Sequence, residues 1–313
     1  MSKPTPSQAT ASRSTKQEHT AGKSHGGPQT VSARWISLAF GSVVAVAVLC
    51  VWGALCYAFW QGSWQLLYHP AAAVTHTPVE AEIAFSNISF DAIDAGVPQL
   101  QGWWIPAATG TGSTVLYFHG ATGNLGDTVT GLARLHRAGL AVFTLDYRGY
   151  GQSQFAHPNE THWREDAESA LHYLTDTRHV AAGTIIVAGQ GLGADLALEV
   201  AAAHPELAGL IVEDPLLDPM SMLFQDPRAR LVPAHWLVKD RWDLKAAAAT
   251  LSVPSLWFCS SPVCGSTKTG EEPAPFKAVQ ASKTIVWLAA QARAQKDYEE
   301  ALSRWIDDLA SKR

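Results

Sequence analysis

One short stretch of this sequence has the pattern of a turn that presents a reactive side chain. An apolar, β-branched run ends at Gly189, and an alanine- and leucine-rich segment typical of a helix follows at residues 194–203. A strand, a tight turn and a helix in this order form a nucleophile elbow, in which the middle residue of Gly-x-Ser-x-Gly lifts its hydroxyl above the sheet. The outer glycines are Gly189 and Gly193, but the middle residue is Gly191, which has no side chain. The sequence therefore predicts the turn without its nucleophile.

The composition narrows the class of protein that carries this turn. The chain has 313 residues and a net charge of −5, and no run of basic residues interleaved with aromatic ones occurs in it. We therefore expect no nucleic-acid partner. Its histidines are scattered without the spacing of metal ligands, so we expect no metal site and no cofactor.

The N-terminal part is predicted to hold a disordered tail and a membrane anchor. Residues 1–34 are polar with almost no large apolar side chain, so they cannot offset the entropy of ordering. Residues 35–60 form the predicted anchor. Its stretch 36–60 has no charged residue, and at ~1.5 Å per residue it reaches across a hydrocarbon core of ~30 Å. A cleaved signal peptide is the alternative, but the apolar region of a signal peptide spans only ~7–15 residues. Residues 61–313 are predicted to form one folded domain.

Flanking residues predict how the anchor is placed and oriented. Trp35 and Trp60 lie at its ends, where amphipathic rings favour the headgroup region. Five basic residues and one acidic residue, Glu18, precede it, and the next Lys or Arg after it is Arg134. Because positively charged flanks stay in the cytoplasm, we expect a single-pass membrane protein with a cytoplasmic N-terminus and an extracytoplasmic folded domain.

The rest of the chain predicts an α/β fold. Two strands, at residues 84–90 and 100–105, open the domain as an antiparallel pair, and strands then alternate with helices. Such alternation implies a mostly parallel sheet with helices on both faces. The further strands are expected at residues 114–118, 140–145, 185–187, 208–212, 255–259 and 284–288, and the helices at 127–137, 164–175, 194–203 and 294–309.

Further motifs accompany the elbow. They lie at residues 66–70, 100–106, 116–120 with 123–126, 146–153 and 209–214. The pair His119-Gly120 and the run Asp146-Tyr-Arg-Gly-Tyr-Gly, with an elbow at the right spacing, are the most specific of them. In their order and their residues, these motifs resemble those of the α/β-hydrolase superfamily. Within it the chain is similar to the membrane-anchored branch of serine-aminopeptidase-like and acyl-thioesterase-like proteins.

The resemblance implies an oxyanion hole beside the elbow. The family forms this hole from two backbone N–H groups, one after the nucleophile and one after the strand that ends in His-Gly. By position these groups belong to Leu192 and to Ala121, which follows His119 and Gly120. Backbone donors do not depend on side-chain identity, so we expect the hole to remain. His119 itself is expected to be structural or to line the pocket.

The resemblance also implies a Ser-His-Asp triad, and the sequence lacks all three side chains at the expected places. The nucleophile position is Gly191, residues 260–270 contain no carboxylate, and no histidine follows His235. Three separate losses are hard to reconcile with triad catalysis, because triad geometry is unforgiving.

Five residues near the elbow and the acid loop are candidates to replace the missing triad side chains. Asp195 follows the elbow and is expected to provide charge at a helix N-terminus. Glu213 and Asp214 could be a relocated acid or could hydrogen-bond a loop. Cys259 and Cys264 could pair across a short loop or remain two free buried thiols, since spacing alone does not decide between these states.

The predicted cleft has an enlarged floor and aromatic walls. A glycine at position 191 leaves space below a ligand, and residues 215–245 are too short for a large lid and predict one or two short helices. The expected wall residues are Trp103, Trp104, Phe224 and Trp236.

Three hypotheses about function follow. The first is a membrane-tethered, catalytically degenerate hydrolase-fold domain that binds a small acyl-type ligand or a protein partner. The second is an active hydrolase of esters, thioesters or peptides with a rearranged site. The third is a structural membrane protein whose cleft is filled. An open cleft would separate the first hypothesis from the third, and turnover would separate the second from both.

Overall fold

The computed structural model describes residues 32–92, 97–108, 112–260, 264, 272–288 and 294–311. The chain divides into two units, Met1–Val51 and Trp52–Arg313. Most of the predicted tail lies outside the described residues.

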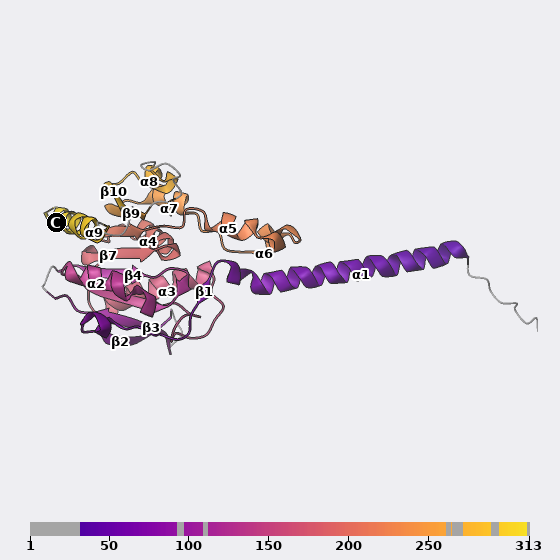
Figure 1. Ribbon diagram of the computed structural model, residues 1–313, viewed down its shortest axis with the longest axis horizontal. Coiled ribbons are helices and arrows are strands. Elements are labelled where there is room, and N and C mark those ends of the chain that lie inside the picture. Colours follow the sequence, from indigo (N-terminus) through magenta and orange to yellow (C-terminus); the bar gives the residue numbers. More distant parts are fainter. Residues whose placement is uncertain are drawn as a thin grey trace, which may run out of the picture. The chain divides into compact units, whose positions relative to one another are not determined.

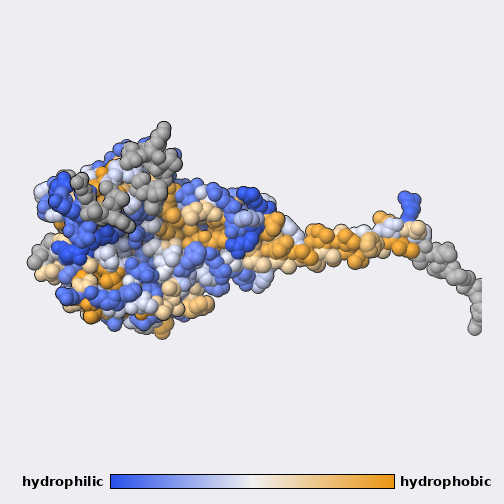
Figure 2. Space-filling view, viewed as in Figure 1, coloured by the Kyte–Doolittle hydropathy of each residue, from blue (hydrophilic) through white to orange (hydrophobic). Residues whose placement is uncertain are grey.

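The predicted anchor forms one long helix. Helix α1 spans Ala33–Gly62, two residues beyond each end of the predicted segment 35–60. It has no acidic residue in its first turn and no basic residue in its last. By length and composition it could cross a membrane, and Figure 2 shows that its surface is largely hydrophobic. A signal sequence passes the same test near an N-terminus.

The folded domain is built on an eight-stranded sheet in the order β10-β9-β8-β7-β4-β6-β3-β2 (Figure 1). All neighbouring strands are parallel except β2 with β3 and β3 with β6, so the predicted mostly parallel sheet is confirmed. Its strands are β2 Ser86–Asp91, β3 Pro98–Ile105, β4 Thr114–Phe118, β6 Ala141–Asp146, β7 Ile185–Gln190, β8 Gly209–Glu213, β9 Ser255–Ser260 and β10 Lys283–Leu288. A small parallel pair, β1 His69–Pro70 with β5 Thr122–Gly123, was not predicted.

Helices cover both faces of the sheet because strand side chains alternate between them. On β4, Leu116 and Phe118 pack into one apolar cluster, and Val115 and Tyr117 pack into a second. The first cluster includes side chains from α3 Glu160–His172, α4 Leu192–Ala203, α7 Leu244–Thr250 and α8 Ala274–Ala278. The second includes side chains from α2 Val129–Arg137 and α9 Ala294–Ser311.

Two helices begin at residues different from those predicted: a side chain caps α3, and a capped 3-10 turn precedes α2. Asn159 accepts a hydrogen bond from the backbone N–H of His162 at 2.9 Å, and α3 therefore starts at Glu160 instead of residue 164. Asn124 caps a 3-10 turn, Leu125–Thr128, and α2 follows that turn instead of starting at residue 127.

A small cap, defined here as residues 219–237, follows β8. It contains α5 Pro219–Gln225, the 3-10 turn Pro227–Arg230 and α6 Ala234–Leu237. Phe59 of α1 packs with the cap residues Leu223 and Ala229 in a third apolar cluster. The prediction of short helices in place of a large lid is confirmed.

Candidate functional site

The elbow has the backbone that a nucleophile turn requires. Gly191 lies between β7 and α4 with φ +57° and ψ −126°, a conformation that glycine adopts far more readily than other residues. Its N–H donates to the carbonyl of Glu213 at 3.0 Å, and its carbonyl accepts from the N–H of Ala194 at 3.0 Å. These bonds fix the turn against β8 and the first turn of α4.

The two outer glycines are sterically required. A Cβ atom on Gly189 would lie 2.1 Å from the carbonyl oxygen of Gly193, and a Cβ on Gly193 would lie 2.2 Å from that of His119. A Cβ on Gly191 would meet only the Cα of Gly120, at 4.0 Å. The turn therefore keeps the close packing of an elbow and has room for a side chain where none is present.

This contrast predicts a small cost for a side chain at the elbow. We expect Gly191→Ala to lower the free energy of unfolding by about 1–2 kcal/mol, because the space is open and only the positive-φ backbone is unfavourable for a residue with a side chain. Chemical denaturation of the two proteins measures the difference. A loss of about 3 kcal/mol or more would show that the position is crowded instead of open.

The predicted oxyanion-hole residues lie together at this turn. Gly120, Ala121 and Gly191 are half-buried and Leu192 is buried. The carbonyl of Ala121 accepts bonds from the backbone N–H of His69 and the hydroxyl of Tyr150, each at 2.8 Å. Among the described residues, the N–H groups of Ala121 and Leu192 donate to no protein acceptor. Two backbone donors therefore remain beside the partly exposed Gly191.

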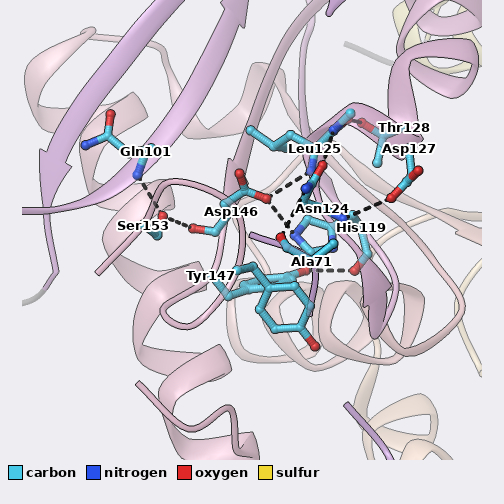
Figure 3. A network of polar contacts seen from close by, with 12 residues as sticks. Ala71, Gln101, His119, Asn124, Leu125, Asp127, Thr128, Asp146, Tyr147 and Ser153 are labelled. Atoms are coloured by element: carbon cyan, nitrogen blue, oxygen red, sulfur yellow. Dashed lines mark hydrogen bonds and ion pairs between the residues drawn. The ribbon is translucent and has the colours of Figure 1, made fainter. Parts of the chain in front are cut away.

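His119 is a structural residue that cannot reach a ligand at the elbow. Its side chain is 1 % exposed, with Nδ1 2.8 Å from the carbonyl oxygen of Gly120 and Nε2 3.5 Å from Oδ1 of Asp146. Burial lowers its pKa to about 4, so the ring is neutral at pH 7, and we assign the Nδ1 proton to the bond with Gly120. Nδ1 faces the Gly120 carbonyl and Nε2 faces Asp146 without a hydrogen bond among the described residues (Figure 3), so His119 itself is not placed to act as a base for a nucleophile at residue 191.

Asp146, the first residue of the motif at 146–153, is a buried acid whose role the sequence does not indicate. Its Oδ1 accepts a hydrogen bond from the N–H of Leu125 at 2.9 Å (Figure 3). Burial raises its pKa to about 7. Gly151, at φ +48°, passes so close that a Cβ there would lie 1.9 Å from Oδ2 of Asp146. Gly151 of this motif therefore lets the chain pass close to a buried carboxyl group.

The raised pKa of Asp146 predicts a pH dependence of stability. Between its unfolded pKa of about 4 and its folded pKa of about 7, the folded state keeps a proton that the unfolded state has lost. Its contribution is therefore full below pH ~4 and is lost as the pH rises through ~7. His119, with a pKa lowered to about 4, acts in the opposite direction and loses its contribution as the pH falls.

We expect Asp146→Asn to remove the first effect. The free energy of unfolding should then fall less between pH 5 and pH 8 than it does in the wild type, by about 2 kcal/mol. Denaturant titrations of both proteins at both pH values give this difference. Parallel pH profiles would mean that Asp146 is already ionised at pH 5.

The two acids proposed to replace the triad acid both form hydrogen bonds with neighbouring elements. Glu213 accepts a hydrogen bond from the hydroxyl of Tyr298 on α9 at 2.5 Å, and burial raises its pKa. Asp214 accepts bonds from the N–H and Oγ of Ser260, at 2.5 and 2.8 Å. Both acids therefore hold neighbouring elements together, as the loop-bonding alternative predicted.

Asp195 differs from its prediction. It lies in the first turn of α4 but is only 1 % exposed. Its Oδ1 accepts from the N–H of Leu216 at 3.1 Å, and among the described residues its Oδ2 has no partner. Burial raises its pKa well above the usual range. The predicted position in the first helical turn is confirmed, whereas burial favours the protonated acid and so opposes the predicted charge there.

The structure decides between the two cysteine alternatives, but it describes little of the loops that would hold the triad acid and base. Cys259, on β9, forms a disulfide with Cys264, with a Cα–Cα distance of 5.7 Å. Neither sulfur is then a nucleophile while the bond is intact. Most of the segments in which the family's acid and base would lie, residues 261–263, 265–271 and 289–293, are outside the described residues.

Two of the four predicted wall residues do not lie at the elbow. Trp103 and Trp104 lie on β3, which β6 and β4 separate from β7. For these two the prediction is wrong, because sequence order says nothing about strand order in a sheet with crossovers. Phe224 packs on the ring of His235, with centroids 3.9 Å apart, and Trp236 is 87 % exposed; for these two it stays a prediction.

The comparisons with known proteins agree with this geometry. A family model described as serine aminopeptidase, S33, matches residues 111–304. A Mycobacterium tuberculosis protein described as uncharacterised is 29% identical over 174 residues, which cover 55% of this chain and 60% of the relative. The alpha/beta hydrolase domain-containing protein 17C of Xenopus tropicalis is 28% identical over 166 residues, covering 51% of this chain and 53% of the relative. The match thus spans little more than half the length of these relatives.

Solved structures share the fold at low sequence identity. An esterase from Pyrococcus furiosus has a TM-score of 0.57 at 16% identity and covers 79% of this chain, with 98% of its own length. An acetyl xylan esterase from a Paenibacillus species has a TM-score of 0.53 at 19% identity, covering 80% of this chain and 93% of its own length. The sheet order, the elbow and the family match over residues 111–304 together show that the chain belongs to the serine aminopeptidase S33 family of the α/β-hydrolase superfamily.

Proposed function

We propose that this protein is a membrane-tethered α/β-hydrolase-fold domain that has lost triad catalysis and uses its elbow to bind an acyl-type ligand. The tether is α1, with the N-terminus in the cytoplasm and the folded domain on the other side. One observation carries the proposal: the elbow keeps the steric demands of a nucleophile turn, yet residue 191 has no side chain although space for one is open. An elbow built in this way can hold a ligand but cannot attack it.

The ligand contact would be the pair of backbone N–H groups. In the family such donors bind the oxygen of an acyl group as negative charge develops on it. Here the N–H groups of Ala121 and Leu192 have no protein acceptor among the described residues, and Gly120, Ala121 and Gly191 are half-buried, not covered. The carbonyl or carboxylate oxygen of an acyl compound matches these donors in charge and in hydrogen bonding.

A matched pair of variants at position 192 tests the contact. Leu192 is the first residue of α4, where proline fits a helix. Leu192→Pro removes the backbone N–H of residue 192. Leu192→Ala also removes the leucine side chain but keeps this N–H. With octanoate as the probe, calorimetry of the full chain in detergent micelles should show binding to the wild type and to Leu192→Ala, and a loss of at least about tenfold for Leu192→Pro. Equal affinity of the two variants would contradict the contact.

The same samples test for turnover. We expect no hydrolysis of 4-nitrophenyl octanoate or octanoyl-CoA by the wild type above that of Gly191→Ala, because neither protein has a nucleophile at the elbow. Oxyanion donors alone can leave weak residual catalysis, ~10³–10⁴-fold over water in serine proteases, and this background would be common to both proteins. Saturable turnover that is lost on denaturation and exceeds this background would support a rearranged active hydrolase and overturn the proposal.

A further inference from the structure

The C-terminal end of α1 is held by the cap. The indole Nε1 of Trp52 donates to the carbonyl oxygen of Leu231 at 3.2 Å. One turn later, Leu55 and Phe59 line a groove of about 360 Å³ together with Arg228 and Leu231. One side of residues 52–62 therefore contacts the cap through Trp52, Leu55 and Phe59, while most other residues of this stretch are exposed.

Charges on the cap limit how deep this part of α1 can lie in a membrane. The guanidinium of Arg228 is 2.9 Å from a carboxylate oxygen of Asp226, and Arg230 is exposed. If the bilayer enclosed residues 36–60, Trp52 would lie about 12 Å below its surface, at a rise of 1.5 Å per residue. The cap would then carry these charges into hydrocarbon, at a cost of about 2.5–3.5 kcal/mol for each one near the centre.

A shorter span removes this conflict. Residues 35–51 of α1, which follow Arg34 and carry no charge, rise about 26 Å, close to a hydrocarbon core of about 30 Å. Trp35 is the first residue of this segment and Trp52 directly follows it, and their side chains are 71 % and 47 % exposed. Indole rings at this spacing suit the two interfaces of a bilayer.

The cap has the surface of an element that rests on lipid headgroups. Leu231 is 63 % exposed and Trp236 is 87 % exposed, and the exposed guanidinium groups of Arg228 and Arg230 lie in the same segment. Exposed apolar and aromatic side chains next to basic ones are typical of interfacial segments, where the basic groups meet lipid phosphates.

We propose that the bilayer surface lies at the level of Trp52 and that the cap rests on it, with Leu231 and Trp236 among the lipid headgroups. This inference rests on the membrane tether of the proposed function, and it specifies how deep α1 lies in the bilayer. Residues 53–62 are then a juxtamembrane helix outside the hydrocarbon, and the partner of the cap is the surface of the membrane that holds the anchor.

Two native cysteines flank the proposed surface and provide its test. Cys50 and Cys56 are free thiols on either side of Trp52. The full chain is reconstituted into phosphatidylcholine and phosphatidylglycerol vesicles, opened by freeze–thaw so that a water-soluble maleimide reaches both faces. We expect Cys56 to be labelled at least tenfold faster than Cys50, with Cys50→Ser and Cys56→Ser assigning the two sites. Tyr57→Cys in the Cys50→Ser, Cys56→Ser background adds a position that is 61 % exposed, in case packing slows Cys56.

The outcomes separate the inference from the tether. If Cys50, Cys56 and the Tyr57→Cys site all resist labelling in protein that alkaline carbonate cannot extract, the anchor stands and the surface at Trp52 is wrong. If carbonate releases the protein and Cys50 is labelled as fast as Cys56, the tether itself is wrong.

A probe on the cap tests its contact with the bilayer. An environment-sensitive fluorophore at Leu231→Cys, in the background without Cys50 and Cys56, should be quenched by lipids that carry a nitroxide at the headgroup. The same fluorophore at Asp307→Cys, an exposed position on α9, is the control and should not be quenched. Equal quenching at the two positions would overturn the contact. Thermal melts that match that of the parent protein establish that both variants are folded.

Discussion

Replacing Gly193 by alanine is expected to lower the free energy of unfolding by about 3 kcal/mol or more. The new Cβ would lie 2.2 Å from the carbonyl oxygen of His119 and 2.4 Å from that of Phe118. Both contacts are with the backbone of β4 and its turn, which cannot rotate away as a side chain could. Relief requires α4 to move away from the sheet, and such a movement would also open the elbow.

The matched control is Gly183→Ala. Its Cβ would meet no heavy atom closer than 3.8 Å, so the change should alter stability by less than about 1 kcal/mol. Urea denaturation monitored by tryptophan fluorescence gives both values. Near-wild-type stability of Gly193→Ala would contradict the close approach of α4 to β4 on which the elbow depends.

Replacing Arg148 by alanine is expected to cost about 3–5 kcal/mol, because it leaves a buried acid without its partner. Asp166 on α3 is fully buried, and its Oδ1 lies 2.6 Å from Nε of Arg148. Its Oδ2 accepts from the backbone N–H of Arg148 at 2.8 Å. Burial already raises the pKa of Asp166 to about 6, and loss of the guanidinium would raise it further. The variant should therefore lose least stability near pH 5, where the acid is neutral in the fold.

Two further variants make this prediction specific. Arg137→Ala breaks the exposed pair of Arg137 with Glu299, at 3.1 Å, and should cost less than about 1 kcal/mol. Asp166→Asn in the Arg148→Ala background removes the unpaired charge and should recover part of the loss. If Arg148→Ala and Arg137→Ala were equally mild, the buried pair would contribute no more than a surface pair.

The strand, turn and helix of the elbow could be predicted because the residues that specify them are adjacent in the sequence. The run 185–187, the break at Gly189 and the helix that follows are adjacent in the chain, and period and turn residues are enough to recognise them. The family motifs added the resemblance to the α/β-hydrolase superfamily. Helix starts were less accurate, because a capping side chain such as Asn159 determines them.

Features that depend on distant contacts could not be predicted in this way. The burial of Asp195 depends on packing around α4 and β8, and a carboxylate in a first helical turn is otherwise read as exposed charge. The walls of a cleft depend on strand order, which placed Trp103 and Trp104 away from Gly191. Whether Cys259 and Cys264 pair depends on the path of a loop, and spacing alone left this open.

The central claim is that this elbow belongs to a domain without triad catalysis, and covalent labelling tests it most directly. The full chain in detergent micelles is incubated with a fluorophosphonate probe, next to an active serine esterase as the positive control, and intact mass is measured with peptide mapping of any adduct. We predict no adduct on this protein under conditions that label the esterase completely, because residue 191 is glycine. A stoichiometric adduct on one serine of the folded protein would contradict the claim and would identify a relocated nucleophile.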